Sequence, residues 1–138
     1  MSTSVLFVCN MNSVRSPMAA AMLRQRGGAA VEVDSAGVYE GWLDPFAVAV
    51  MQEIGVSLEE HEPKAMKTID LEEVDHIIAL TEEAAAEARR FLPAERITLW
   101  RVRNPSNERG GRDEVLTAYR GVRDELSQRI DALIAELS

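Results

Sequence analysis

The sequence predicts a three-layer α/β fold, in which one parallel β-sheet is covered by α-helices on both faces. Short runs rich in β-branched residues alternate with helical patterns along the chain, as in parallel sheets with helical crossovers. The connections are short, and no linker, internal repeat or low-complexity tract interrupts them. With 138 residues, 46% of them apolar, we expect the chain to form a single domain, residues 1–138.

Four short apolar runs are expected to form the strands of this sheet. The expected strands are 4–8, 30–34, 74–80 and 97–100. Each run is short and is bounded by turn residues or by a helical pattern, which is typical of buried strands. The second strand closes at Ser35-Ala36-Gly37. His76 falls inside the third strand, so we expect it to have a structural role.

Four helices are expected to connect and follow these strands. They cover residues 17–26, 45 to about 55, 82–91 and 113 to the end of the chain. Gly27-Gly28 ends the first, Asp44 (N-cap) and Pro45 start the second, and Thr81 caps the third. The last helix has an apolar stripe with spacings of three and four residues: Val115, Tyr119, Val122, Leu126, Ile130, Leu133 and Leu137.

Composition excludes several classes of protein. The net charge of −8 argues against a nucleic-acid-binding surface, which needs clustered Lys and Arg. Cys9 is the single cysteine, so an internal disulfide framework and a four-thiolate zinc site are impossible. No apolar run approaches the ~20 residues of a membrane span. The N-terminal residues lack the pattern of a secretory signal, so we expect a cytoplasmic protein that does not bind membranes.

The loop after the first strand carries the chemistry that the sequence predicts. Cys9 follows the strand directly, and Arg15, Ser16 and Pro17 come after a spacer of five residues. A loop between a strand and a helix N-terminus directs backbone N–H groups at an anion. Arg15 can bind two phosphate oxygens at once. The same field stabilises a Cys9 thiolate, and the Ser16 hydroxyl can donate to that sulfur, so the loop suits attack on phosphorus. The alternative is a small buried cysteine beside a surface arginine.

This chain resembles the low-molecular-weight protein tyrosine phosphatases and the arsenate reductases that share their fold. The shared landmarks extend over nearly the whole chain: Cys9 with Arg15-Ser16-Pro17, Ser35-Ala36-Gly37, Asp44-Pro45 and His61. The resemblance implies a four-stranded sheet in the order 2-1-3-4 with a phosphate-binding loop after the first strand. It also implies a reaction that needs neither a metal nor another cofactor.

The resemblance implies a role for each residue of the loop. Cys9 attacks phosphorus and forms a phosphocysteine, which water then hydrolyses. Arg15 and the backbone N–H groups of the preceding residues hold the phosphate oxygens. Those residues are Asn10, Met11, Asn12, Ser13 and Val14. Asn12 shapes the loop because asparagine tolerates a positive φ, and Ser35 and His61 brace it. A solvated or loosely packed loop histidine is the alternative for His61.

One departure from the family pattern concerns proton transfer. The general-acid Asp of these phosphatases is followed by Pro, and here Asn104-Pro105 stands at that position. Asn cannot donate a proton to the departing oxygen, and losing positioned acid–base catalysis typically costs about 10²–10⁴-fold. Glu108 and Asp113 are nearby in sequence. Either residue could replace the acid. Alternatively, Glu108 is a solvated charge on the loop and Asp113 interacts with the dipole of the last helix.

Other departures concern the substrate and the thiol chemistry. Ser106 and Asn107 replace the aromatic residues that usually flank a phosphotyrosine ring, so Tyr39 and Trp42 are the candidates for an aromatic wall. Met11 replaces a glycine that is common in this loop. Val14 stands where many members have a second cysteine. Without further cysteines, the thioredoxin-coupled reduction of arsenate is excluded.

We therefore expect a cysteine-dependent phosphatase. Its substrate is expected to be a protein with a phosphotyrosine-like phosphorylated residue, or a small phosphate ester. Two alternatives stay open. One is a pseudo-phosphatase that binds phosphate or a phosphoprotein with little or no turnover, which Asn104 favours. The other is an arsenate reductase that uses an external thiol.

Overall fold

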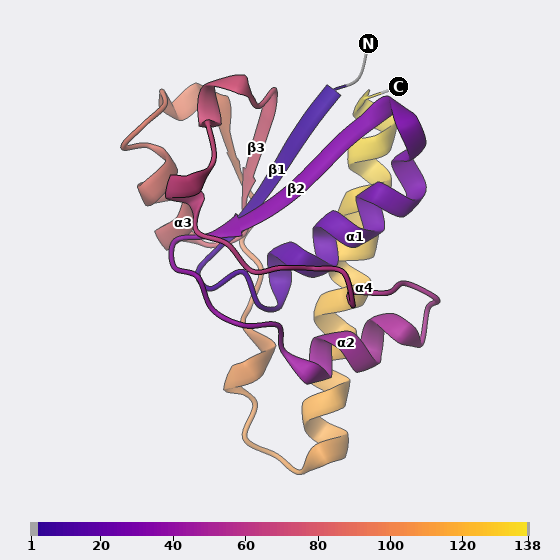
Figure 1. Ribbon diagram of the computed structural model, residues 1–138. Helices are drawn as coiled ribbons and strands as arrows, with labels where there is room; N and C mark the ends of the chain where they lie inside the picture. Colours follow the sequence, from indigo (N-terminus) through magenta and orange to yellow (C-terminus); the bar gives the residue numbers. More distant parts are fainter. Residues whose placement is uncertain (1–2, 138) are drawn as a thin grey trace.

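The computed structural model describes residues 3–137 and contains the predicted parallel sheet (Figure 1). Its strands are β1 (Thr3–Cys9), β2 (Val31–Gly37), β3 (His76–Ala79) and β4 (Ile97–Leu99). They lie in the order β2-β1-β3-β4, and every neighbouring pair is parallel. The predicted order is therefore confirmed. Because all strands run the same way, their carboxyl ends meet at one edge of the sheet.

Helices cover both faces of the sheet, which confirms the three layers (Figure 1). The α-helices are α1 (Arg15–Gly27), α2 (Pro45–Gln52), α3 (Glu82–Ala88) and α4 (Arg112–Leu137). The strand β1 alternates between the two cores: Val5, Phe7 and Cys9 pack with residues of α1, α2 and α4, whereas Leu6 and Val8 pack with residues of α3. Among the described residues, no helix is long and apolar enough to span a membrane. Short 3-10 helices occur at Gly28–Ala30 (η1), Met66–Thr68 (η2), Leu71–Glu73 (η3), Ala94–Arg96 (η4) and Pro105–Asn107 (η5).

Two predicted boundaries near the functional loop are wrong. The strand β2 extends to Gly37 instead of ending at residue 34, because it pairs with β1 along its whole length, from Thr3↔Val31 to Cys9↔Gly37. The helix α1 begins at Arg15 and not at Pro17. Proline fits the first helical turn, where the N–H groups have no intrahelical acceptor, so Pro17 does not mark the start.

The third strand is shorter than predicted. Residues 74 and 75 precede β3, because pairing with β1 begins only at Val5↔His76. The carboxylate of Asp75 instead accepts a hydrogen bond from the Ser4 backbone N–H. His76 is therefore the first residue of β3, and its side chain is exposed and not buried within the strand. The helix α3 and the strand β4 also end earlier, at Ala88 and Leu99, and Ser138, the predicted end of the last helix, lies outside the described residues.

Candidate active site

The loop from Cys9 to Arg15 joins the buried end of β1 to the start of α1. Each of its first six carbonyl groups accepts a hydrogen bond from outside the loop or from the next helical turn. The donors to the carbonyls of residues 9 to 14 are, in order, Val38 N, Tyr39 N, Gly41 N, His61 Nε2, Asp44 N and Met18 N. With all these carbonyls occupied on the outside, the backbone N–H groups are left for the inside of the loop.

The inside of the loop is a small polar pocket of about 160 Å³. Within residues 3–137, no acceptor is hydrogen-bonded to the N–H groups of residues 10 to 15. Cys9, Asn10, Met11, Ser13, Val14 and Arg15 line the pocket together with Asp44, Asn104 and Ser106. Convergent N–H groups at a helix N-terminus bind anions. The pocket is thus suited to a tetrahedral oxyanion above the Cys9 sulfur.

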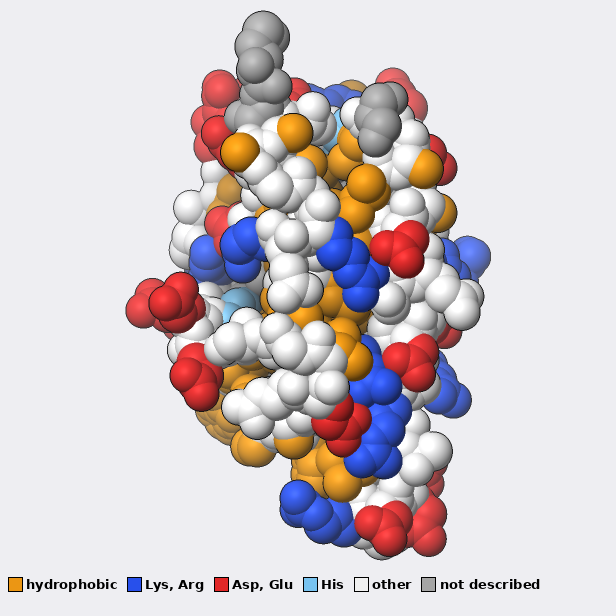
Figure 2. Space-filling view, turned by 90° about the vertical axis from the view of Figure 1, so that its right-hand side faces the viewer, with side chains coloured by type: hydrophobic (Ala, Val, Ile, Leu, Met, Phe, Trp, Pro, Cys, Tyr) orange, Lys and Arg blue, Asp and Glu red, His pale blue; other side chains and the backbone are white. Residues whose placement is uncertain are grey.

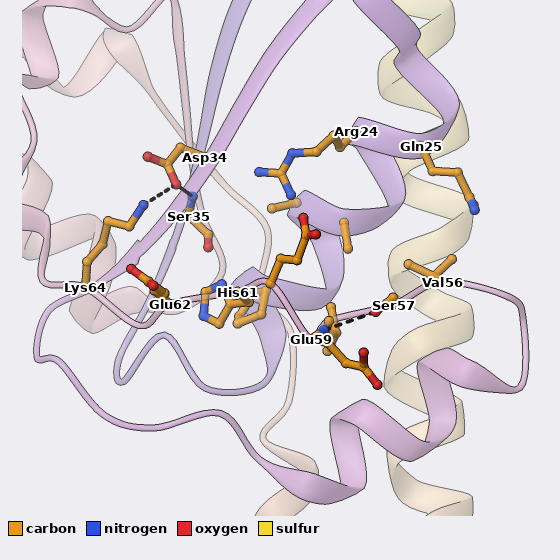
Figure 3. A pocket seen from close by; sticks show the side chains of 15 residues that line it. Arg24, Gln25, Asp34, Ser35, Val56, Ser57, Glu59, His61, Glu62 and Lys64 are labelled. Atoms are coloured by element: carbon orange, nitrogen blue, oxygen red, sulfur yellow. Dashed lines mark hydrogen bonds and ion pairs between the residues drawn. The ribbon is translucent and has the colours of Figure 1, made fainter.

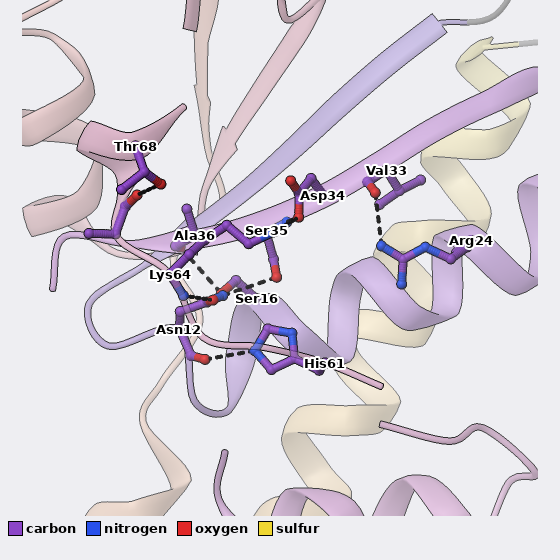
Figure 4. Close-up of polar contacts among 11 residues, drawn as sticks. Asn12, Ser16, Arg24, Val33, Asp34, Ser35, Ala36, His61, Lys64 and Thr68 are labelled. Carbon is purple, nitrogen blue, oxygen red and sulfur yellow. Dashed lines mark hydrogen bonds and ion pairs between the residues drawn. The ribbon is translucent and has the colours of Figure 1, made fainter. Parts of the chain in front are cut away.

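Ser16 and Asn12 hold the base of the loop (Figure 4). The Cys9 sulfur lies 2.9 Å from Ser16 Oγ. The Asn12 amide nitrogen donates to Ser16 Oγ at 2.8 Å and to Ser35 Oγ at 3.0 Å. Because Ser16 Oγ already accepts this bond, its hydrogen can be donated to the sulfur. The pairing of Cys9 with Ser16, expected from the sequence, is present in the structure.

Asn12 also joins the loop to the segment that contains His61 and Lys64 (Figure 4). Its side-chain oxygen accepts from the Lys64 backbone N–H at 2.9 Å, and its carbonyl lies 3.0 Å from His61 Nε2. Asn12 is fully buried with φ of 55°, a conformation that asparagine adopts more readily than most residues. A side chain at Gly37 would lie 2.7 Å from the Asn12 nitrogen. Glycine is therefore required where β2 meets the loop.

Arg15 is fixed by a contact that the sequence did not predict. Its side chain is buried, and Nη1 donates to the Val102 carbonyl at 2.9 Å. Burial lowers the pKa of Arg15, and the neighbouring Cys9 charge opposes that shift. An arginine keeps its proton under such conditions. A fixed cation in a partly dry pocket interacts more strongly with a phosphate than a solvated one does.

The far wall of the pocket is polar. Asn104 Oδ1 accepts from the backbone N–H and the hydroxyl of Ser106, at 3.0 Å and 2.6 Å, which fixes the start of η5. The pocket lining includes neither Tyr39 nor Trp42, which are 56% and 83% exposed. Glu108 and Asp113 are exposed and do not line the pocket either. Of the residues considered for the acid position, the structure thus brings only Asn104 to the pocket.

Asp44 lines this pocket, as Ser106 does, and sequence reasoning assigned neither residue to the site. The backbone N–H of Asp44 donates to Ser13 O, its Oδ1 caps α2 by accepting from Phe46 N, and its Oδ2 accepts from the Tyr119 hydroxyl at 2.6 Å. Burial and this contact raise the pKa of Tyr119, so the hydroxyl stays protonated and donates. The Asp-Pro pair signalled a helix start and matched a family landmark, but the bond from Asp44 to α4 depends on tertiary packing.

A larger hollow of about 600 Å³ lies behind the loop. It is lined by α1, β2 and residues 56–64, and Ser35, His61 and Lys64 separate it from the phosphate-binding loop (Figure 3). On the face shown in Figure 2, acidic side chains lie along both margins, with basic side chains between and beside them. The hollow does not reach Cys9 or Arg15. The thiol, Arg15 and the loop residues instead line the smaller pocket.

We expect His61 to make stability depend on pH. Burial lowers the pKa of His61 below its ordinary value of 6.5; the bond to Asn12 O opposes this, and the charges of Lys64 and Asp34 act in opposite directions. The unfolded chain therefore takes up the proton first, and the free energy of unfolding falls as the pH drops below about 6.5. Urea unfolding across pH should show this loss for the wild type, and a smaller loss for His61→Gln. Equal pH slopes for the two proteins would contradict the assignment.

Among the described residues, no group of His, Cys, Asp or Glu side chains is arranged to hold a metal ion.

Comparison with known proteins identifies the relatives of this chain. A glutaredoxin arsenate reductase from Synechocystis is 26% identical, over 97% of this chain and 98% of that protein. A low molecular weight protein-tyrosine-phosphatase from Streptomyces coelicolor is 33% identical, over 98% of this chain and 89% of that protein. The solved structure of an arginine phosphatase from Geobacillus stearothermophilus superposes with a TM-score of 0.84 at 30% identity, over 98% and 92% of the two chains.

The model of one family, described as low molecular weight phosphotyrosine protein phosphatase, matches residues 4–138. That match spans every element of the fold and the whole loop from Cys9 to Arg15. The expected resemblance is confirmed. The chain belongs to the low molecular weight phosphotyrosine protein phosphatase family.

Proposed function

We propose that this protein is a phosphatase that hydrolyses a phosphorylated protein or a small phosphate ester through a phosphocysteine at Cys9. One observation carries the proposal: the thiol lies at the base of a pocket into which six consecutive N–H groups and the Arg15 guanidinium are available to bind an oxyanion. An anion held this way presents its phosphorus to the sulfur. Electrostatic stabilisation of the transferring group is usually the largest contribution to such catalysis.

In the first step the Cys9 thiolate attacks phosphorus. The S–P bond forms, the bond from phosphorus to the leaving oxygen breaks, and the departing oxygen takes its proton from water because Asn104 has none to give. Arg15 and the N–H groups of residues 10 to 15 hold the three equatorial oxygens throughout. The absence of a general acid favours leaving groups that depart as stable anions.

In the second step water hydrolyses the phosphocysteine. The oxygen of water bonds to phosphorus, the P–S bond breaks, and the products are inorganic phosphate, a proton and the regenerated thiolate. Ser16, 2.9 Å from the sulfur, donates its hydroxyl hydrogen to the departing thiolate. This contact accelerates the step because a charged sulfur accepts a stronger hydrogen bond than a neutral one.

The nature of the leaving group follows from the pocket wall. Ser13, Asp44, Asn104 and Ser106 line it, so the leaving group meets hydrogen-bonding side chains and a carboxylate near the phosphorus. Tyr39 and Trp42 then act farther out, as contacts for the protein that carries the phosphate. The relatives named above include a tyrosine phosphatase and an arginine phosphatase. A polar wall favours a leaving group that donates hydrogen bonds over a bare aromatic ring.

The chain's single cysteine supports a cytoplasmic location, because a catalytic thiolate survives best in a reducing compartment. We also propose that residues 1–138 act as one domain.

The decisive experiment is hydrolysis of p-nitrophenyl phosphate, whose leaving group needs little help from an acid. We expect release of nitrophenol together with a phosphate adduct on the peptide containing Cys9, detected by mass spectrometry after rapid denaturation. Turnover without that adduct would exclude the covalent route. Binding of inorganic phosphate without any turnover would instead establish a pseudo-phosphatase.

Arsenate reduction is the second candidate, because the Synechocystis relative is an arsenate reductase of the glutaredoxin-dependent type by name. A thiol on the same chain cannot assist, since Cys9 is the only one. The assay adds arsenate with glutathione and glutaredoxin and follows glutathione oxidation. Oxidation that depends on arsenate and on Cys9 would support the reductase, and its absence beside phosphatase turnover would exclude it.

A further inference from the structure

The loop 101–112 forms one rim of the phosphate pocket. It runs from the end of β4 to the start of α4 and extends beyond the carboxyl edge of the sheet (Figure 1). Asn104 and Ser106 line the pocket, and the Val102 carbonyl holds Arg15. A protein whose phosphorylated residue enters the pocket must therefore pass this rim.

The charge of this rim is opposite to the charge of the chain. Its twelve residues contain four arginines and a single acidic residue, Glu108, in a chain with net charge −8. The four are Arg101, Arg103, Arg109 and Arg112, and all are exposed. Arg101 pairs with Glu82, and Arg112 lies over the Phe46 ring. Arg103 and Arg109 form no ion pair with any residue between 3 and 137, so their charges are available to a partner.

The guanidinium of Arg103 lies against α4 at a glycine inside that helix. A Cβ atom at Gly121 would lie only 2.5 Å from the Arg103 guanidinium, so the guanidinium rests where any other residue would place its side chain. A glycine in the interior of a helix weakens it. Gly121 therefore leaves room for this exposed side chain to lie close to the helix.

We propose that the rim formed by Arg103 and Arg109 binds acidic residues that flank the phosphorylated residue of a protein substrate. This inference rests on the proposed phosphatase function. The site would then recognise two features of the substrate: a phosphoryl group, which binds in the pocket, and flanking carboxylates, which bind to Arg103 and Arg109. Exposed charges of this kind act mainly on encounter and orientation. A nucleic acid carries charge along its whole length and is repelled by a chain with net charge −8, whereas a short acidic peptide segment needs only the two arginines of this loop.

The test compares three phosphotyrosine peptides that differ only in flanking residues: Glu, Gln or Lys. We expect kcat/KM in the order Glu, Gln, Lys, with about a threefold to tenfold step between the first and the last, since each exposed ion pair contributes little. The difference should shrink above about 0.5 M salt, where charges are screened within a few ångströms. Each rate is divided by the same protein's rate with p-nitrophenyl phosphate, which has no flanking residues.

The double variant Arg103→Glu/Arg109→Glu should invert the order of the peptides. Arg89→Glu, at the exposed end of α3 and without an ion pair among the described residues, is the matched control and should keep the wild-type order. The affinities of the three peptides for the Cys9→Ser variant should follow the same order, and this binding measurement does not depend on turnover. If no peptide is hydrolysed by the wild type but the order of affinities persists, only the phosphatase proposal fails. Equal kcat/KM for the three peptides, or the same change in the Arg89 control, would overturn the inference.

Discussion

Replacing the thiol by a hydroxyl, Cys9→Ser, is expected to lower phosphatase turnover by a factor on the order of 10⁴ or more. Serine is nearly the same size and can keep the contact with Ser16 Oγ, which lies 2.9 Å from the sulfur. Its hydroxyl is a far weaker acid than a thiol, and the one carboxylate in the pocket lining, Asp44, already accepts from Phe46 N and the Tyr119 hydroxyl. The attack on phosphorus then loses its nucleophile, while the oxyanion-binding groups stay in place.

The control for this variant is binding of inorganic phosphate, measured by calorimetry. We expect Cys9→Ser to bind phosphate at least as well as the wild type, since Arg15 and the N–H groups of the loop are unchanged. An intact binding site with no turnover would locate the loss in the chemical step. Turnover within tenfold of the wild type would mean that another group is the nucleophile.

Installing an acid at the pocket wall, Asn104→Asp, is expected to raise kcat for phenyl phosphate by about 10²–10⁴-fold. Aspartate keeps the acceptor atom that binds the Ser106 N–H and hydroxyl, at 3.0 Å and 2.6 Å, so η5 should retain its start. Phenolate is a poor leaving group and benefits from a proton, whereas p-nitrophenolate benefits little. The gain should therefore be large for phenyl phosphate and small for p-nitrophenyl phosphate.

Two further variants test whether position or charge causes the gain. Asn107→Asp adds the same charge at the end of η5, away from the pocket lining, and should leave both rates unchanged. Adding Ser106→Ala to Asn104→Asp removes the hydroxyl that stabilises the ionised carboxylate, and should raise the rate further by favouring the protonated form. An equal gain from Asn107→Asp would mean that the added charge acts at a distance and not as an acid.

The structure explains how one short loop can be both rigid and open to an anion. Six carbonyls bind outward, Asn12 takes the one positive φ of a non-glycine residue among those described, and Arg15 is anchored 87 residues away in sequence at Val102. Because the loop is ordered before the phosphate binds, binding does not have to include the conformational entropy cost of ordering the loop. The same preorganisation supports the transition state, because the dipoles need not reorient during the reaction.

The sequence by itself determined the sheet order expected from the family resemblance, the three layers and the loop of Cys9 and Arg15. These features are local: a strand end, a five-residue spacer and a helix start are contiguous, and alternation of elements limits a short chain to few topologies. The pairing of Cys9 with Ser16 follows from the same short stretch, whereas the positive φ at Asn12 was expected from the family resemblance.

Only the tertiary structure decided which distant groups complete the site. The Val102 carbonyl on Arg15, the Tyr119 hydroxyl on Asp44 and the Gly121 backbone under Arg103 join segments that lie far apart in sequence. It also left Tyr39 and Trp42 outside the pocket and shortened β3, which pairs with β1 only from His76. Such contacts depend on the length of each strand and loop, which is set by pairing and packing with the rest of the fold. Local propensity does not determine these lengths.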